Sequence, residues 1–148
     1  MPAARGAAII CDTGALLDYL VEEAPDHAAF RTAIDRARAR YVPALVLAEL
    51  DYFLRDERDA MRTFMSDLAR GAFTYAPPDA AQLARAMDID EQFNDLELGL
   101  VDASIVALAE ELSLRRVATK DVRDLGAVRL RDGTALELVV MPTVPDRK

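Results

Sequence analysis

The chain has 148 residues, 52% of them hydrophobic, and its 26 acidic and 18 basic side chains give a formal net charge of −8. This length and apolar content predict one domain over residues 1–148, with flexible tails at 1–6 and 142–148, and exclude a disordered chain. No apolar run approaches the roughly 18 residues that a membrane-spanning helix needs, so we expect no membrane association.

The sequence alternates between short apolar runs and segments of helical periodicity. Strands are predicted at 7–11, 41–42, 73–75, 116–119 and, at a sheet edge, 136–141. Helices are predicted at 15–20, from after Pro25 towards Arg40, and at 44–54, 57–69, 80–93 and 101–112, with a loop towards the end of the acidic stretch 88–97. This alternation predicts an α/β sandwich around a mostly parallel sheet with right-handed crossovers, and it leaves the strand order open.

Charge and cysteine content bear on partners and compartment. A net charge of −8 is unexpected for a nucleic-acid enzyme, because phosphate backbones are normally met by a basic field. It is compatible with RNA cleavage if the acids bind divalent cations, and equally with a role in solubility alone.

The single cysteine, Cys11, cannot form an internal disulfide, which favours a reducing, cytoplasmic compartment. The apolar run 7–11 is too short for the core of a signal peptide.

Three aspartates lie where ligands collect in α/β proteins, beyond the carboxyl ends of the strands. Asp12 directly follows the first strand, Asp121 follows the strand at 116–119, and Asp102 lies near the start of the last long helix. Helix capping explains Asp12 or Asp102 equally well when each is considered singly.

Glu49 is the sharper indication of a site. The residues three and four positions away from it on the predicted helix are apolar or aromatic: Leu45, Val46, Tyr52 and Phe53. A carboxylate on that face is partly desolvated and must be protonated, paired or bound to metal. Asp51 has Arg55 four residues ahead and can form an ordinary surface ion pair.

Four carboxylates without clustered His or Cys suit a hard cation such as Mg²⁺ or Mn²⁺, whose charge would relieve their mutual repulsion. A metal there could activate water for attack on a phosphodiester.

His27 is the only histidine, so a paired-imidazole mechanism is excluded, and we expect it to pack or cap locally. P-loop, esterase, zinc-protease and C-x-x-C motifs are absent.

Four ordered segments resemble the PIN-domain family, particularly VapC-type toxins of bacterial and archaeal toxin–antitoxin pairs. They are IICDTGALL at 9–17, PALVLAEL at 43–50, DLELGLVDASIVALAE at 95–110 and VATKDVRD at 117–124. The resemblance implies a three-layer α/β/α fold and Mg²⁺- or Mn²⁺-dependent endonucleolytic cleavage of single-stranded RNA. It also implies a homodimer and a cognate antitoxin whose C-terminal segment lies across the groove.

The family's acidic quartet falls on Asp12, Glu49, Asp102 and Asp121. The resemblance makes Asp12 the central metal ligand, with Glu49 and Asp102 completing the metal shell and Asp121 binding directly or through water. Further expected contributors are Thr13, which supports Asp12 through its hydroxyl, Asp124 and Asp95. Two departures, Gly14 where Ser is common and Leu125 where an aromatic is usual, remove no carboxylate.

Basic residues near the predicted groove are candidates for contact with substrate. Lys120 lies between Thr119 and Asp121, and is expected either to meet phosphate or to neutralise the acids; Arg123 is a second candidate. Others that could lie near the groove entry are Arg36, Arg38, Arg40, Arg115 and Arg116. For Arg36 and Arg40, which share a predicted helix face, a solvated rim fits better.

Two other functions remain open. A receiver-like domain would bind Mg²⁺ around a phosphorylated aspartate, but the expected acid cluster after the first strand is absent, and Glu49 lies in a helix. A catalytically silent PIN-like module that binds RNA or protein is disfavoured by the intact quartet.

Overall fold

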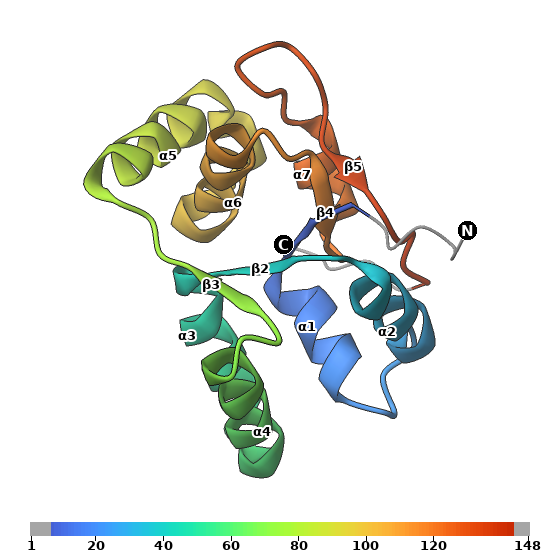
Figure 1. The fold of residues 1–148 in the computed structure, drawn as a ribbon. Helices are drawn as coiled ribbons and strands as arrows, with labels where there is room; N and C mark the ends of the chain where they lie inside the picture. Colours follow the sequence, from blue (N-terminus) through green and yellow to red (C-terminus); the bar gives the residue numbers. More distant parts are fainter. Residues whose placement is uncertain (1–6, 144–148) are drawn as a thin grey trace.

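The computed structural model describes residues 7–143 and shows an α/β fold around one five-stranded sheet (Figure 1). All of its described strand pairs are parallel, and the strand order is β3-β2-β1-β4-β5. The strands are β1 (Ile9–Cys11), β2 (Arg40–Pro43), β3 (Thr74–Ala76), β4 (Arg116–Ala118) and β5 (Glu137–Leu138). The mostly parallel sheet and the edge position of the last strand are therefore confirmed.

Helices pack on both faces of the sheet, which gives the expected α/β/α layers. In Figure 1, α1 and α2 lie on one side of the strands, and α5 and α6 pack together on the other. The helices are α1 (Thr13–Leu20), α2 (His27–Arg36), α3 (Ala44–Phe53), α4 (Arg58–Ala69), α5 (Ala80–Gln92), α6 (Gly99–Leu112) and α7 (Val122–Ala127), with a 3₁₀ turn η1 (Asn94–Leu96).

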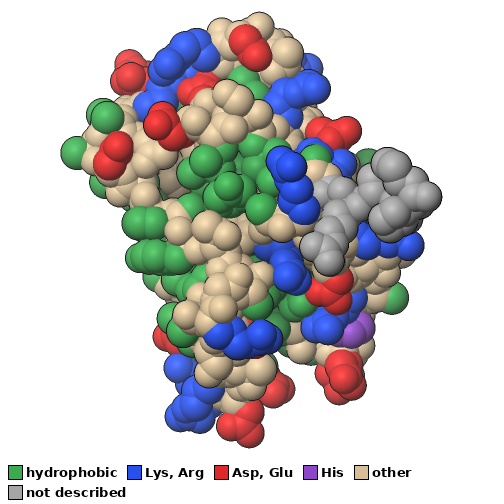
Figure 2. All heavy atoms as spheres, in the orientation of Figure 1, with side chains coloured by type: hydrophobic (Ala, Val, Ile, Leu, Met, Phe, Trp, Pro, Cys, Tyr) green, Lys and Arg blue, Asp and Glu red, His purple; other side chains and the backbone are tan. Residues whose placement is uncertain are grey.

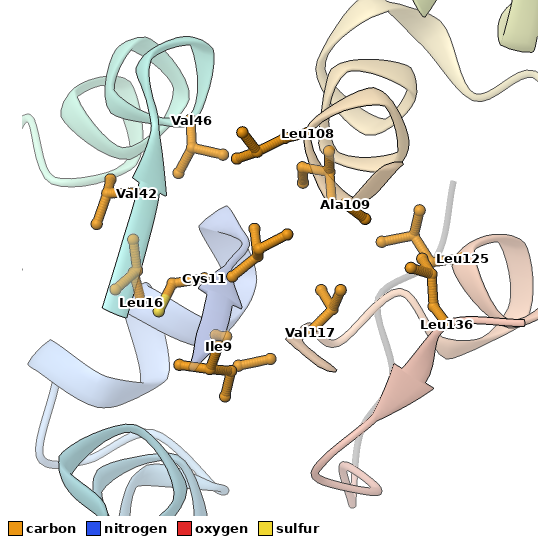
Figure 3. Packing of buried hydrophobic residues seen from close by; sticks show 14 of the residues in the cluster. Ile9, Cys11, Leu16, Val42, Val46, Leu108, Ala109, Val117, Leu125 and Leu136 are labelled. Carbon is orange, nitrogen blue, oxygen red and sulfur yellow. The ribbon is translucent and has the colours of Figure 1, made fainter. Parts of the chain in front are cut away.

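The central strand explains why the acids after it are held in place. All three residues of β1 are fully buried, and β1 pairs with β2 on one side and β4 on the other. Figure 3 shows its side chains packed with those of α1, α3, α6 and β4. The ladder continues for one residue, because the Asp12 amide donates to the Ala118 carbonyl at 2.9 Å. The carboxyl ends of β1 and β4 are thereby fixed side by side.

Three local predictions are corrected by the structure. The second helix ends at Arg36 rather than near Arg40, because Arg40 pairs with Ile9 in the sheet. The short helix α7 was not predicted; Asp121 begins it by accepting a hydrogen bond from the Asp124 amide. Asp51 pairs with Arg58 at 2.8 Å, whereas Arg55 lies over the Tyr52 ring.

Of the tails predicted at 1–6 and 142–148, residues 1–6 and 144–148 lie outside the described residues. Of the remaining tail, Thr143 is held by hydrogen bonds from its amide and its hydroxyl to the Asp26 carboxylate, so the structured part extends beyond the predicted boundary at 142. No helix within residues 7–143 combines the length and apolar character that a bilayer-spanning segment requires.

Candidate active site

A cavity of about 490 Å³ opens at the carboxyl ends of the central strands, and five acids line it. They come from separate parts of the chain: Asp12, Glu49, Glu97, Asp102 and Asp121. The four acids expected from the sequence thus meet at one cavity, although up to 109 residues separate them, as counted from Asp12 to Asp121 (121 − 12).

Asp12 caps α1, its carboxylate is buried, and each of its two oxygens accepts a hydrogen bond. Its Oδ1 accepts from the Thr13 amide at 2.7 Å, and its Oδ2 accepts from the Thr119 hydroxyl at 2.7 Å. Burial raises the pKa of Asp12 from 3.8 to about 6; the two hydrogen bonds oppose this rise, and the charges of Glu49 and Asp121 add to it. A neighbouring cation would therefore stabilise the ionised form.

Glu49 lies on α3 and reaches the cavity beside Asp12. Its side chain is half-buried, as the apolar residues on its helix face predicted, and its Oε1 accepts a hydrogen bond of 2.6 Å from the Thr13 hydroxyl. Thr13 therefore contacts two acids: its amide binds Asp12 and its hydroxyl binds Glu49. This contact differs from the expected hydroxyl bond to Asp12 itself.

Thr119, the residue directly after β4, joins Asp12 to Asp121. Its side chain is fully buried; the hydroxyl donates to Asp12 and accepts the Asp121 amide at 2.9 Å. Burial raises the pKa of Asp121 and of Asp124, and the guanidinium of Arg123 opposes the rise in both. Sequence reasoning missed Thr119, although a hydroxyl residue two positions before an acid at a strand end was the available signal.

Asp102 occupies the first turn of α6 and is buried on the wall of the cavity. Glu97 also lines the cavity, whereas Asp95, the loop acid expected from the resemblance, lies on η1 outside it. Glu97 adopts a left-handed conformation (φ 53°) between η1 and α6. Asp95 was expected from the resemblance alone, and a backbone turn that brings Glu97 to the cavity cannot be located from the acidic stretch.

The two basic candidates for substrate contact differ in their surroundings. Lys120 is buried, and its Nζ lies 3.1 Å from Asp18 Oδ2, so it neutralises an acid of α1 and does not line the cavity. Arg123 is exposed and close enough to Asp121 and Asp124 to lower the pKa of both. His27 acts locally, as expected: its Nδ1 lies 2.8 Å from the Asp18 carbonyl.

Comparison with known proteins identifies the family. Residues 9–129 match the PIN domain, a span that contains every acid of the cavity. The chain belongs to the PIN-domain family. A protein of Mycobacterium tuberculosis named Ribonuclease VapC26 is 39% identical over 124 residues, which cover 82% of this chain and 92% of the relative.

Solved structures share this PIN fold at lower identity. One is Mycobacterium tuberculosis VapC20, described as a toxin that cleaves the sarcin-ricin loop, with a TM-score of 0.64 and 18% identity over 74% of this chain and 86% of that chain. Another is VapBC2 of Rickettsia felis bound to promoter DNA, with a TM-score of 0.59 and 12% identity over 79% of this chain and 90% of that chain. Both support the PIN fold of the chain.

The donor set of the PIN cavity fits a hard divalent cation. Its charged groups are all carboxylates, and the charges of Glu49 and Asp121 already disfavour ionisation of Asp12. Across the described part of the chain, no three His, Cys, Asp or Glu side chains converge as a preformed cage. The oxygen donor set alone therefore supports the cation, because Mg²⁺ and Mn²⁺ prefer carboxylate oxygens in proteins.

Proposed function

We propose that this PIN-domain protein is a metal-dependent endoribonuclease that hydrolyses phosphodiester bonds in single-stranded RNA, as the toxin of a type II toxin–antitoxin pair. The observation that carries the proposal is the meeting of Asp12, Glu49, Asp102 and Asp121 at one cavity. The 39% identity to a protein named Ribonuclease VapC26 supports the same activity.

In this proposal the four acids hold Mg²⁺ or Mn²⁺. The bound ion would supply Lewis-acid stabilisation of the phosphate and lower the pKa of a water molecule. The protein's own part is to position the oxygens: Thr119 and the Thr13 amide fix both oxygens of Asp12, and the Thr13 hydroxyl fixes Glu49. Asp124 supports Asp121 from the first turn of α7 through its amide.

The resemblance to VapC-type toxins implies the partners, and the acidic cavity indicates the charge that one of them would carry. We expect a cognate antitoxin with a basic C-terminal segment, because opposite charges favour its docking over these acids. We also expect a homodimer and a cytoplasmic location. Co-expression of the neighbouring small gene product should relieve growth arrest caused by this chain; unchanged growth on expression alone would argue against the toxin role and leave the nuclease activity untouched.

The nuclease activity is tested with matched acid-to-amide variants. Asp12→Asn, Asp102→Asn and Glu49→Gln should each abolish cleavage of single-stranded RNA in Mg²⁺ while the circular dichroism spectrum stays native. Asp51→Asn is the control for Glu49→Gln, because Asp51 lies two residues further along α3 but is exposed and outside the cavity. Cleavage at the wild-type rate by Asp12→Asn or Asp102→Asn would refute the site. RNA binding without cleavage by the wild type would identify a silent module.

A further inference from the structure

The cavity offers little electrostatic attraction to RNA. Five carboxylates line it, the net charge is −8, Lys120 is engaged with Asp18 inside the protein, and of the two basic candidates only Arg123 is exposed beside the acids. Over the face shown in Figure 2, basic and acidic side chains are interspersed. Proteins that bind RNA usually gain affinity from basic groups that neutralise phosphates. Metal ions can screen the acids, but the nucleotides beside the scissile phosphate need a further source of binding energy.

An aromatic side chain on the cavity wall can supply it. Phe53, the last residue of α3, lines the cavity and is 55% exposed, although its helix contributes Val46 and Leu50 to the core. Its ring is braced by Tyr52, with 5.5 Å between the ring centroids and an interplanar angle of 75°. Arg55 in turn lies over the Tyr52 ring at 4.3 Å and donates to the Tyr52 carbonyl at 2.8 Å.

We propose that Phe53 stacks on an unpaired nucleobase of the RNA, next to the phosphate that the acids address. Stacking on an aromatic ring does not depend on the charge of the surroundings, and it tolerates any base because every base has a π face. The cavity volume of about 490 Å³ lies within the range of roughly 300–1,000 Å³ that is typical of ligand sites. A base held in a duplex is already stacked, so Phe53 would select single strands.

This inference rests on the proposed function, because it names the substrate contact at the same cavity. The competing occupant is a protein, either an antitoxin segment or a second copy of the chain, since exposed apolar side chains also mark protein interfaces. RNA is favoured because Phe53 shares its cavity with the acids that would act on the phosphate.

Because the sequence contains no tryptophan, Phe53→Trp would introduce the only indole as a fluorescent probe of the cavity. The titrant is a short single-stranded RNA of mixed sequence in Mg²⁺, with Asp102→Asn as background so that no cleavage intervenes. The control is Tyr75→Trp, at an exposed aromatic position (52%) on the edge strand β3 outside the cavity. RNA should quench the indole at 53 and not at 75. A matched RNA with abasic sites should quench it weakly.

Kinetics provide the second test, in the wild-type background. Phe53→Ala should raise KM for single-stranded RNA by about 5- to 150-fold, the effect expected for one stacked base, with a smaller change in kcat. Phe53→Trp, which keeps an aromatic ring at this position, should have a KM close to that of the wild type. Tyr75→Ala should leave KM unchanged. An unchanged KM in Phe53→Ala, or equal quenching by abasic and normal RNA, would overturn the inference. If KM were unchanged and the oligomeric state or antitoxin binding were lost, Phe53 would belong to a protein interface.

The two proposals fail separately. The quenching assay requires binding and no cleavage, so it can succeed even if the wild-type protein does not hydrolyse RNA. Conversely, cleavage that depends on Asp12 and Asp102 but not on Phe53 would retain the nuclease and reject the stacking contact.

Discussion

Asp12→Asn changes the charge of a buried carboxylate while preserving its shape, so its effect on stability can be worked out from the structure. Asp12 is 5% exposed, and both of its oxygens accept hydrogen bonds. Burial and the nearby charges of Glu49 and Asp121 oppose its ionisation, and its pKa rises from 3.8 to about 6. The asparagine keeps one acceptor oxygen and carries no charge.

The sign of the effect follows from the direction of the shift. Well below pH 3.8 the folded and unfolded chains both hold the proton on Asp12. As the pH rises towards 6, the unfolded chain releases its proton first, so the free energy of unfolding falls. The rise from 3.8 to about 6 corresponds to about 3 kcal/mol lost above pH 6, at 1.36 kcal/mol per pKa unit. Asp12→Asn removes this loss of stability, but it also removes one charged hydrogen bond. Losing that bond costs about 1.5–3 kcal/mol and offsets part of the stabilisation.

At pH 8 we therefore expect the urea midpoint of Asp12→Asn to equal or exceed that of the wild type. At pH 4 the midpoint of the variant should fall relative to that of the wild type. The relative change between the two pH values should be about 2.5 kcal/mol, because the unfolded chain has already released part of this proton at pH 4. Far-UV circular dichroism in EDTA is the suitable probe, because the chain has no tryptophan. Mg²⁺ at pH 8 should stabilise the wild type and have little effect on the variant. If the free energies of unfolding of the two proteins changed in parallel with pH, burial would not raise the pKa of Asp12 as the structure indicates.

Three further results are expected. Thr119→Val removes the hydroxyl bond that lowers the pKa of Asp12, so the acid limb of the pH–rate profile should move up by about one unit; an unmoved limb would contradict the assigned bond. Lys120→Met leaves the buried charge of Asp18 without its ion-pair partner and should reduce the free energy of unfolding by about 3–5 kcal/mol. The double variant Lys120→Met/Asp18→Leu should regain much of this stability. A wild-type urea midpoint for the single variant would rule out a structural ion pair. Chelation by EDTA should stop RNA cleavage and either Mg²⁺ or Mn²⁺ should restore it, whereas cleavage that persists in EDTA would exclude a metal-dependent mechanism.

The sequence alone determined the alternation of strands and helices and the location of the acids after them. Hydrophobic period and length are local properties, so the buried run that becomes β1 and the helical face around Glu49 could be recognised without a structure. The resemblance then joined the four acids into one set. It placed Asp95 in the site, where the structure brings Glu97 to the cavity wall.

Only the tertiary structure decided which strands are neighbours and which side chains complete the cavity. The order β3-β2-β1-β4-β5 brings Thr119 to Asp12 across 107 positions of sequence, and it brings Lys120 to Asp18 across 102. The partner in neither contact could be assigned from the local sequence, because a hydroxyl or an ammonium group can bond to any acid that the fold brings within reach. The pairing of β1 with β4 fixes that reach, and it depends on packing of the whole core rather than on the residues at either end.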